Sequence, residues 1–220
     1  MIISGPSSNF RSIVMNKGKF VTLEGGEGVG KSTNLEFVRH FLERRGRKVI
    51  VTREPGGTRL GEQVRSILLA DGVISPQTEL LLLFAARAQH LSEVILPALA
   101  EGTWVVSDRF TDASYAYQGG GRGIDRNFIE MLEQRVQHPL QPDLTLLFDA
   151  PVEIGMMRAK KRGPSDRFEA ETVAFFERVR EAYLDRAGRF PQRIRIIDAS
   201  HPLPVVQSEI AARLEALCRT

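Results

Sequence analysis

The chain has 220 residues, of which 42% are hydrophobic and 26% are charged. This composition is typical of a soluble globular protein, and the length suits one α/β domain. Thirty basic residues nearly balance 27 acidic ones, which argues against the concentrated positive charge of a nucleic-acid-binding protein. The single cysteine, Cys218, excludes an internal disulfide bond and permits a reducing compartment.

The first 18 residues, MIISGPSSNFRSIVMNKG, differ from the rest. They lack a sustained apolar run and so make a poor signal peptide. We expect a disordered or loosely docked tail over residues 1–18, and Met15 is a second candidate for the translation start. No apolar run reaches the roughly 18 residues that a transmembrane helix needs. The longest run, LLLLFAA at residues 80–86, predicts a buried helix.

Short apolar segments alternate with longer helical patterns from residue 19 onwards. Strands are predicted at 19–25, 48–54, 104–109, 144–150 and 195–199. Helices are predicted at about 31–45, 59–70, 78–100, 125–137, 151–161, 169–187 and 203–218. The alternation predicts parallel strands joined by right-handed crossovers, and the nearly continuous apolar strands predict a sheet covered on both faces. Residues 19–220 are therefore expected to form one domain.

The stretch GGEGVGKST at residues 25–33 matches the pattern G-x-x-x-x-G-K-[ST] between a strand and a helix. Its glycines let backbone N–H groups approach phosphate oxygens, and the start of the following helix adds more N–H groups. Lys31 is expected to reach the β- and γ-phosphates, and the Ser32 hydroxyl to ligate Mg²⁺. This P-loop therefore predicts binding of the triphosphate of ATP or GTP.

Three classes of P-loop protein fit this length. A GTPase needs a guanine-reading N-K-x-D element after a later strand, but the only Asn-Lys pair, Asn16-Lys17, precedes the P-loop. A motor or transport ATPase subunit is disfavoured because the chain is short and has no partner-domain motif. A small-molecule kinase needs a second site for its acceptor, and the remaining motifs favour this class.

Several arginines follow predicted strands or interrupt apolar helices, as expected for an acceptor site. An arginine fork suits bidentate recognition of phosphate, so the acceptor is expected to carry a phosphate itself. A structural salt bridge is the alternative for each arginine. The positions are Arg53 in REPGGT, a tight turn that also contains Glu54; Arg87 in FAAR; Arg109 in SDRF; and Arg122 in AYQGGGRG, which is predicted to be a glycine-rich loop.

Three predicted strands end in an acid: Asp108, Asp149 and Asp198. Ligands of open α/β sheets bind outside the carboxyl ends of the strands, so these acids are candidates to orient a metal, a water or a cation. Capping of the next helix is the alternative, and for Asp149 and Asp198 it is at least as good an interpretation.

The chain resembles the thymidylate kinases, from about residue 19 to the end, in six stretches that follow the family's order: GGEGVGKST, TREPGGT, FAAR, SDRF, AYQGGGRG and RAKKRGPSDR. These nucleoside monophosphate kinases transfer the γ-phosphoryl group of ATP to dTMP with Mg²⁺, giving dTDP and ADP for dTTP biosynthesis. The resemblance implies a three-layer P-loop fold with a five-stranded parallel sheet and a short mobile lid at about 155–168. It also implies a cytoplasmic homodimer that acts on small molecules, without a nucleic-acid or membrane partner.

The resemblance also implies roles for individual residues. ATP would be held by Gly25, Gly26, Glu27, Gly28, Val29, Gly30, Lys31, Ser32 and Thr33. Arg109 would bind the dTMP phosphate, with Asp108 near the metal or its waters. The rest of dTMP would contact Glu54, Arg87, Ser114 and Gln118. The family stacks thymine on a ring four residues before this arginine, where the chain has Leu83; Phe84 is the predicted substitute, and contact with Leu83 is the alternative.

Family members place an assisting arginine either in the P-loop or in the lid. Here the P-loop carries Glu27, whereas the lid carries Arg158 and Arg162, so the chain resembles the second type. Cations stabilise the charge that develops on the transferred group, and Arg158 or Arg162 is the predicted arginine finger. Glu27 would pair with a lid arginine or contact the acceptor, and Lys31 and Arg109 complete the predicted catalytic set. The alternatives are a kinase for another monophosphate and a nucleotide-switched binding protein.

Overall fold

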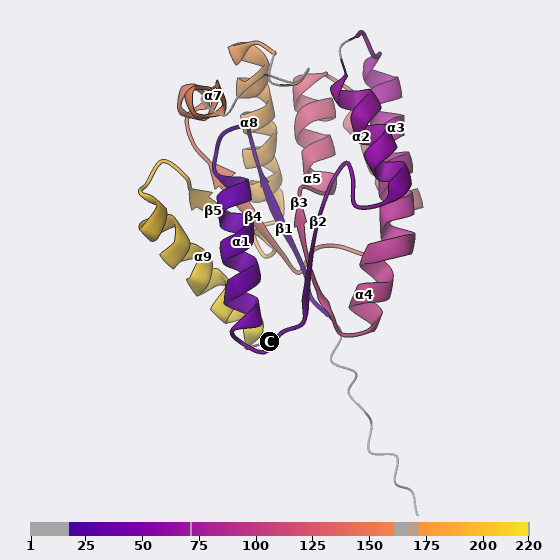
Figure 1. Ribbon diagram of the computed structural model, residues 1–220. Coiled ribbons are helices and arrows are strands. Elements are labelled where there is room, and N and C mark those ends of the chain that lie inside the picture. The colour runs from indigo at the N-terminus through magenta and orange to yellow at the C-terminus, as the bar shows by residue number, and fades with distance from the viewer. Residues whose placement is uncertain (1–17, 71, 161–167, 169–170, 220) are drawn as a thin grey trace, which may run out of the picture.

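Figure 1 shows the computed structural model, in which residues 18–70, 72–160, 168 and 171–219 are described. The expected tail lies outside this range except for Gly18, and so does the candidate start Met15. Of the predicted lid, residues 155–160 and Phe168 are described, whereas Arg162 is not. The expectations for the tail, the start and Arg162 therefore stay predictions.

Within these residues, the sheet consists of five parallel strands in the order β2-β3-β1-β4-β5. The strands are β1 (Phe20–Gly25), β2 (Val49–Arg53), β3 (Trp104–Asp108), β4 (Leu144–Asp149) and β5 (Ile194–Asp198). The central strand β1 pairs with β3 on one side and β4 on the other, which places Thr22 between Ser107 and Thr145. The prediction of a five-stranded parallel sheet is confirmed.

Helices cover both faces of the sheet (Figure 1). They are α1 (Lys31–Glu43), α2 (Arg59–Leu69), α3 (Pro76–His90), α4 (Leu96–Ala100), α5 (Thr111–Ser114), α6 (Arg126–Val136), α7 (Val152–Lys160), α8 (Val173–Arg189) and α9 (Leu203–Cys218). On one face α1 and α9 form the largest apolar cluster with the strands. On the other face, α8 and the segment from α3 to α4 form two further clusters. The three-layer arrangement is confirmed.

The central strand divides its side chains between the two faces. Val21 and Leu23 point to the α1–α9 side, whereas Phe20 packs in the cluster on the other side. Because side chains alternate along a strand, Thr22 and Glu24 share the face of Phe20. All five are fully buried, and each apolar one stabilises the fold by about 1.5–3 kcal/mol. Glu24 thus places a buried carboxyl group on the side of the central strand that also carries Phe20 and Thr22.

The apolar helix predicted at 78–100 is continuous from Pro76 to Ala100, with a π-helical turn at Leu91–Ile95 just before Pro97. The prediction that LLLLFAA is buried is only partly correct, because the side chain of Leu81 is half exposed. In the described chain, this helix alone is long and apolar enough to cross a membrane, a test that the core helices of soluble proteins also pass. Only 39% of its most apolar window is buried.

The glycine-rich segment AYQGGGRG corrects the prediction from the sequence, because it is helical up to Gly121 rather than a loop. The glycines permit close packing against α8. A Cβ atom on Gly120 would lie 2.6 Å from the Cβ of Ala182, and one on Gly121 would lie 2.5 Å from the Phe175 ring. The sequence shows three glycines in a row but not the helix against which they pack.

Candidate active site

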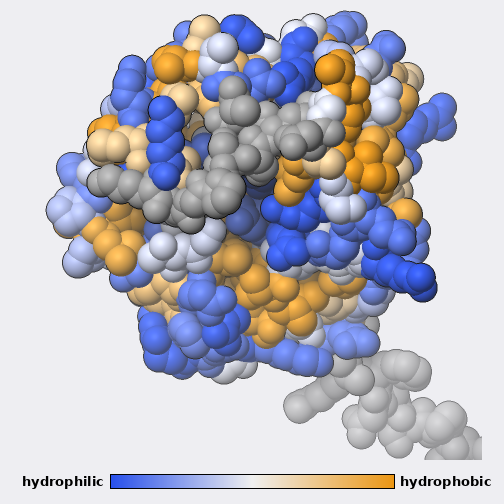
Figure 2. Space-filling model, turned by 45° about the horizontal axis from the view of Figure 1, so that its top comes forward, coloured by the Kyte–Doolittle hydropathy of each residue, from blue (hydrophilic) through white to orange (hydrophobic). Residues whose placement is uncertain are grey.

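A cavity of about 490 Å³ opens where β1, β2 and β3 end, and Figure 2 shows a hollow beside hydrophilic side chains on this face. The loops that follow the three strands and the neighbouring helices form its wall at the carboxyl edge of the sheet, as expected for a parallel sheet. Among the residues predicted for the site, the cavity is lined by Glu27, Gly28, Val29, Gly30, Lys31, Ser32, Thr33, Glu54, Arg87, Asp108, Arg109, Ser114, Gln118 and Arg158.

The P-loop closes over the start of α1. Gly28 and Gly30 have φ angles of 67° and 89°, which glycine adopts readily, and Gly28 also lies against the backbone of Gly155 in α7. The Lys31 ammonium group donates to the carbonyl oxygens of Gly25 at 3.0 Å and Gly26 at 2.6 Å. Burial, followed by the neighbouring Arg109, lowers the pKa of Lys31 to about 8. A phosphate at this loop would stabilise the protonated ammonium group.

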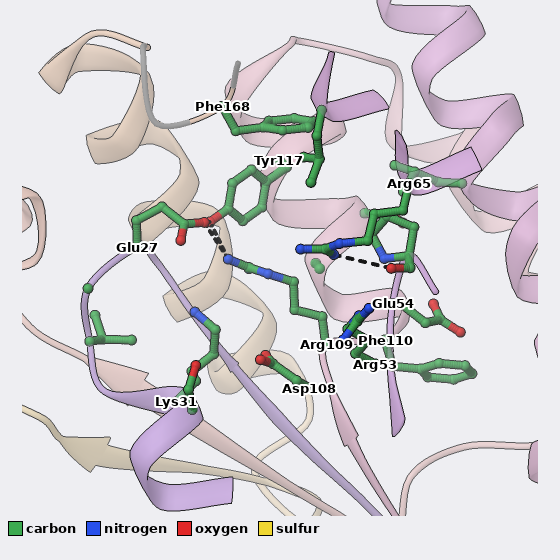
Figure 3. A pocket seen from close by; sticks show the side chains of 18 of the residues that line it. Glu27, Lys31, Arg53, Glu54, Arg65, Asp108, Arg109, Phe110, Tyr117 and Phe168 are labelled. Carbon is green, nitrogen blue, oxygen red and sulfur yellow. Dashed lines mark hydrogen bonds and ion pairs between the residues drawn. The ribbon is translucent and has the colours of Figure 1, made fainter. Parts of the chain in front are cut away.

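Arg109 lies between the P-loop and the helices on the far side of the cavity (Figure 3). Its Nη2 atom donates to Glu27 Oε1 at 2.5 Å and to the Tyr117 hydroxyl at 2.9 Å. Its Nη1 atom donates to the carbonyl oxygen of Gly25 at 3.0 Å and to the Tyr183 hydroxyl at 3.2 Å. The guanidinium group is therefore held at a fixed place in the cavity wall, where an arginine fork suits a phosphate.

A buried polar group lies next to Arg109. The Glu54 carboxylate accepts from Arg87 Nε at 2.7 Å and lies 3.0 Å from His90 Nδ1, and all three side chains are at least 94% buried. Arg87 also donates to the Ser114 hydroxyl at 3.1 Å. Its Nη1 atom is buried and has no hydrogen-bond partner. Arg87 therefore forms a structural salt bridge with Glu54 and also has one hydrogen-bond donor without a partner at the cavity wall.

Oxygen ligands suited to Mg²⁺ line the same cavity. They are the Ser32 hydroxyl at the start of α1 and the Asp108 carboxylate at the end of β3. Asp108 Oδ1 is buried without a hydrogen-bond partner, so it is available to a water or a cation. Mg²⁺ is usually bound by one or two carboxylates together with substrate phosphates, and these two residues fit that requirement. The described residues contain no cluster of three His, Cys, Asp or Glu side chains.

Comparisons with known proteins agree with this geometry. The thymidylate kinase family model matches residues 23–210. The chain belongs to the thymidylate kinase family. The thymidylate kinase of Methylococcus capsulatus is 60% identical over 203 residues, which are 92% of this chain and 98% of that one. That of Nitrosomonas europaea is 55% identical over 202 residues, or 91% of this chain and 94% of the relative.

A solved structure of thymidylate kinase from Ehrlichia chaffeensis matches with a TM-score of 0.74 at 32% identity, covering 90% of this chain and 99% of that one. The resemblance seen in the sequence is confirmed, and so is the P-loop kinase fold. The comparisons give no support to a kinase for another monophosphate or to a nucleotide-switched binding protein.

Some residues that the thymidylate kinase resemblance pointed to lie away from the cavity wall. Phe84, the predicted stacking ring, is 2% exposed and packs in a core cluster with Leu80, Tyr115 and Ile129, whereas Leu83 lines the cavity. Phe84 faces the core because it lies one residue further around α3 than Leu83. Gly25 and Gly26 support Lys31 through their carbonyl oxygens but do not line the cavity.

Of the two remaining predicted arginines, Arg53 lines the cavity and pairs with Glu62 at 2.8 Å, whereas Arg122 and the two remaining strand-end acids make structural contacts. Arg122 pairs with Glu79 and Glu171 and does not line the cavity, so the salt-bridge alternative is correct for it. Asp149 pairs with Arg180 on α8 at 2.7 Å. Asp198 accepts from the backbone N–H of Ser200 at 2.9 Å. Neither acid lines the cavity, in contrast to Asp108.

Several lining residues of this thymidylate kinase family member were not foreseen. Tyr117 and Phe110 flank the predicted residues Gln118 and Arg109, and Phe168 packs edge-on against Tyr117 at 6.0 Å between ring centroids. Arg65 on α2 reaches the cavity and donates to the carbonyl oxygen of Pro55 at 3.2 Å (Figure 3). The single aromatic residue of AYQ, Tyr117, is a usable signal in the sequence, whereas Arg65 lies in an ordinary amphipathic helix and gives none.

Proposed function

We propose that the protein transfers the γ-phosphoryl group of ATP to dTMP, giving dTDP and ADP for dTTP synthesis. Family membership supports this reaction. The observation that carries it is that the P-loop and Arg109 line one cavity, so a donor and an acceptor phosphate can meet there. Phosphoryl transfer requires mainly that the protein position the two reacting phosphates and stabilise the charge that develops between them.

The residues divide into a donor side and an acceptor side. Lys31 and the loop N–H groups bind the ATP phosphates, and Arg109 binds the phosphate of dTMP. Glu54, Arg87, Ser114 and Gln118 position the rest of dTMP, with Leu83 against the base. Mg²⁺, held by Ser32, Asp108 and phosphate oxygens, would neutralise charge on the phosphates. The acceptor phosphate is largely dianionic near pH 7, so no strong general base is needed.

The first experiment is ADP release by purified protein with ATP and Mg²⁺ across a panel of nucleoside monophosphates. Strong stimulation by dTMP, weaker stimulation by dUMP and none by AMP or GMP is expected. Stimulation by a different monophosphate would keep the kinase class but change the acceptor. ATP binding without stimulation by any monophosphate would contradict the reaction and favour a nucleotide-switched binding protein.

We also propose that Arg158 or Arg162 is the arginine finger. Arg158 lines the cavity at the end of α7, where its Nη1 atom donates to the carbonyl oxygen of Ala199 at 2.9 Å. Alanine substitution of the finger should lower kcat by about 10³-fold or more. Near-normal kcat in both Arg158→Ala and Arg162→Ala would exclude the role.

The protein is proposed to be a cytoplasmic homodimer without a nucleic-acid or membrane partner. Leu60 and Ile67 of α2 and Leu81 of α3 are exposed by 43%, 53% and 49%, on two helices that pack together. Figure 2 shows hydrophobic surface on the right, where α2 and α3 lie in Figure 1. Light scattering should give twice the chain mass, and Ile67→Glu should yield monomers; a wild-type monomer at micromolar concentration would contradict the proposal.

A further inference from the structure

Arg109 adopts a backbone conformation that an L residue avoids. Its φ angle is 69°, and it is the only non-glycine residue with a positive φ in the described chain. Such a conformation crowds the Cβ atom and persists only where the surroundings hold it in place.

Three hydrogen bonds fix the two peptide groups beside Arg109. The Arg109 N–H donates to the carbonyl oxygen of Leu23 at 2.9 Å, and the Ser107 hydroxyl donates to the carbonyl oxygen of Arg109 at 2.7 Å. The next N–H, that of Phe110, donates to Glu24 Oε1 at 2.7 Å. Glu24 thus sets the orientation of the peptide group that follows Arg109.

The same carboxyl group also reaches the Arg109 side chain through Tyr183. The Tyr183 hydroxyl donates to Glu24 Oε2 at 2.7 Å, and its oxygen accepts from Arg109 Nη1 at 3.2 Å. Because a hydroxyl has one hydrogen, donation to Glu24 turns the oxygen lone pairs toward the guanidinium group. The two carboxyl oxygens of Glu24 therefore restrain the backbone and the guanidinium group of Arg109 together.

Glu24 does not line the cavity and is fully buried in β1. Burial of a carboxyl group is unfavourable unless it has hydrogen-bond partners, and an apolar residue here would leave the Phe110 N–H and the Tyr183 hydroxyl unpaired. We propose that Glu24 is a positioning residue that, with Tyr183, holds Arg109 in place for the acceptor phosphate. The inference rests on the proposed function, because it takes Arg109 as the group that binds that phosphate.

The test compares steady-state constants of Glu24→Met, Glu24→Gln and Tyr183→Phe with those of the wild type. Glu24→Met should raise the KM for dTMP about tenfold, because a lost hydrogen bond to a charged or buried group weakens binding by that order. Glu24→Gln keeps an acceptor for the Phe110 N–H and should recover part of this loss. Tyr183→Phe removes only the side-chain restraint and should raise the KM about threefold. The KM for ATP should stay unchanged in all three.

Tyr115→Phe is the matched control. Tyr115 is another buried tyrosine whose hydroxyl donates to a carboxylate, that of Glu133 at 2.5 Å, but in the described part of the chain this pair makes no hydrogen bond to Arg109. It should lower the melting temperature without changing the KM for dTMP. If Glu24 and Tyr183 have a purely structural role, their variants should also have a lower melting temperature and an unchanged KM for dTMP, and that result would overturn the inference. Tyr183→Phe is the milder change, so it keeps the test valid even if Glu24→Met fails to fold.

A double-mutant cycle separates this inference from the proposed role of Arg109. If Tyr183 acts through Arg109, Tyr183→Phe should change kcat/KM for dTMP by less than about twofold in an Arg109→Ala background. If the effects of Tyr183→Phe and Arg109→Ala on kcat/KM for dTMP are independent and multiply, the positioning role of Tyr183 is overturned and the role of Arg109 is left intact. A normal KM for dTMP in Arg109→Ala alone would instead refute the phosphate-binding assignment.

Discussion

The Glu27 carboxylate and the Arg109 guanidinium group form an ion pair at 2.5 Å that joins the P-loop to the end of β3. Glu27 also accepts from the Tyr117 hydroxyl at 2.7 Å. Glu27, the acid in the P-loop, therefore occupies one edge of the Arg109 guanidinium group, which is proposed to bind the acceptor phosphate. The sequence predicts a lid arginine or the acceptor as the partner of Glu27, whereas the structure pairs it with Arg109.

Glu27→Gln should strengthen the binding of dTMP to the enzyme in the absence of ATP, by roughly tenfold or less. The substitution removes a negative charge beside two phosphate sites, and charges a few ångströms apart near a protein surface interact by a few kcal/mol at most. Calorimetric titration with dTMP checks this, and Glu27→Asp, which keeps the charge, is the control. Weaker binding of dTMP to Glu27→Gln would show that the carboxylate contacts the nucleotide directly.

Substitutions in the ion pair of Arg87 and Glu54 should separate an effect on stability from an effect on the binding of dTMP. Arg87→Met leaves the Glu54 carboxylate buried without its partner guanidinium group, which should lower the free energy of unfolding by about 3–5 kcal/mol. Adding Glu54→Gln removes the unpaired charge and should restore much of this stability. The KM for dTMP should stay raised in the double variant, since the Arg87 donors are still missing.

Urea unfolding and dTMP kinetics of the two variants measure both quantities. His90→Gln provides a control for the third member of the group, because it alters the contacts of His90 to Glu54 at 3.0 Å and to Thr52 at 2.6 Å but leaves Arg87 in place. Recovery of the KM together with stability would mean that Arg87 has a structural role alone.

The sequence was sufficient for the strands and for the loop that follows β1. Nearly continuous apolar runs place the strands, and the pattern of Gly30, Lys31 and Ser32 between a strand and a helix is specific to phosphate-binding loops. Both signals are local, so they need no knowledge of the fold. The bounds of β1 and α9 accordingly fall within one residue of the prediction.

The sequence could not predict contacts between groups that are far apart in the chain. Glu24 meets Tyr183, 159 residues away, and in β1 it looks like an exception to an apolar strand. The arginine motifs do not reveal that Arg122 faces Glu79, so a structural arginine and a substrate arginine look alike. The three glycines after Gln118 suggest a turn when only the sequence is known. The structure shows that they instead allow close packing against α8.

Gly155 should tolerate no side chain, because a Cβ atom there would lie within 3.0 Å of the carbonyl oxygen of Glu27. Gly155→Ala must therefore push α7 away from the P-loop, which should raise the KM for ATP and lower stability by about 1–3 kcal/mol. Gly188→Ala on α8 is the matched control. Its Cβ atom meets nothing within 4 Å, so the variant should be more stable by up to about 1 kcal/mol.

Nucleotide kinetics and thermal unfolding of the two alanine variants test this contact. An unchanged KM for ATP in Gly155→Ala would show that the P-loop keeps its conformation when α7 moves. Loss of stability in Gly188→Ala would mean that α8 is not free to accept a side chain at its carboxyl end.

The stability of the protein should fall as pH rises because of Glu24. Burial, followed by the nearby Asp112, raises the pKa of Glu24 from 4.5 to about 8, although Arg109, Tyr183 and the Phe110 N–H act in the opposite direction. The folded state therefore binds a proton that the unfolded state has already released between about pH 4.5 and pH 8. The resulting stabilisation is complete below pH 4.5 and is lost as pH rises through 8.

Glu24→Gln cannot titrate and should lack this dependence. The free energy of unfolding of Glu24→Gln minus that of the wild type should increase by up to about 1.4 kcal/mol per pH unit across the window and level off above it. Urea unfolding at pH 5, 6, 7, 8 and 9 measures the difference, and other titrating groups cancel because they are present in both proteins. A constant difference from pH 5 to pH 9 would show that the Glu24 carboxyl group is already ionised in the folded protein at pH 5, with Arg109 and the two hydrogen-bond donors outweighing its burial.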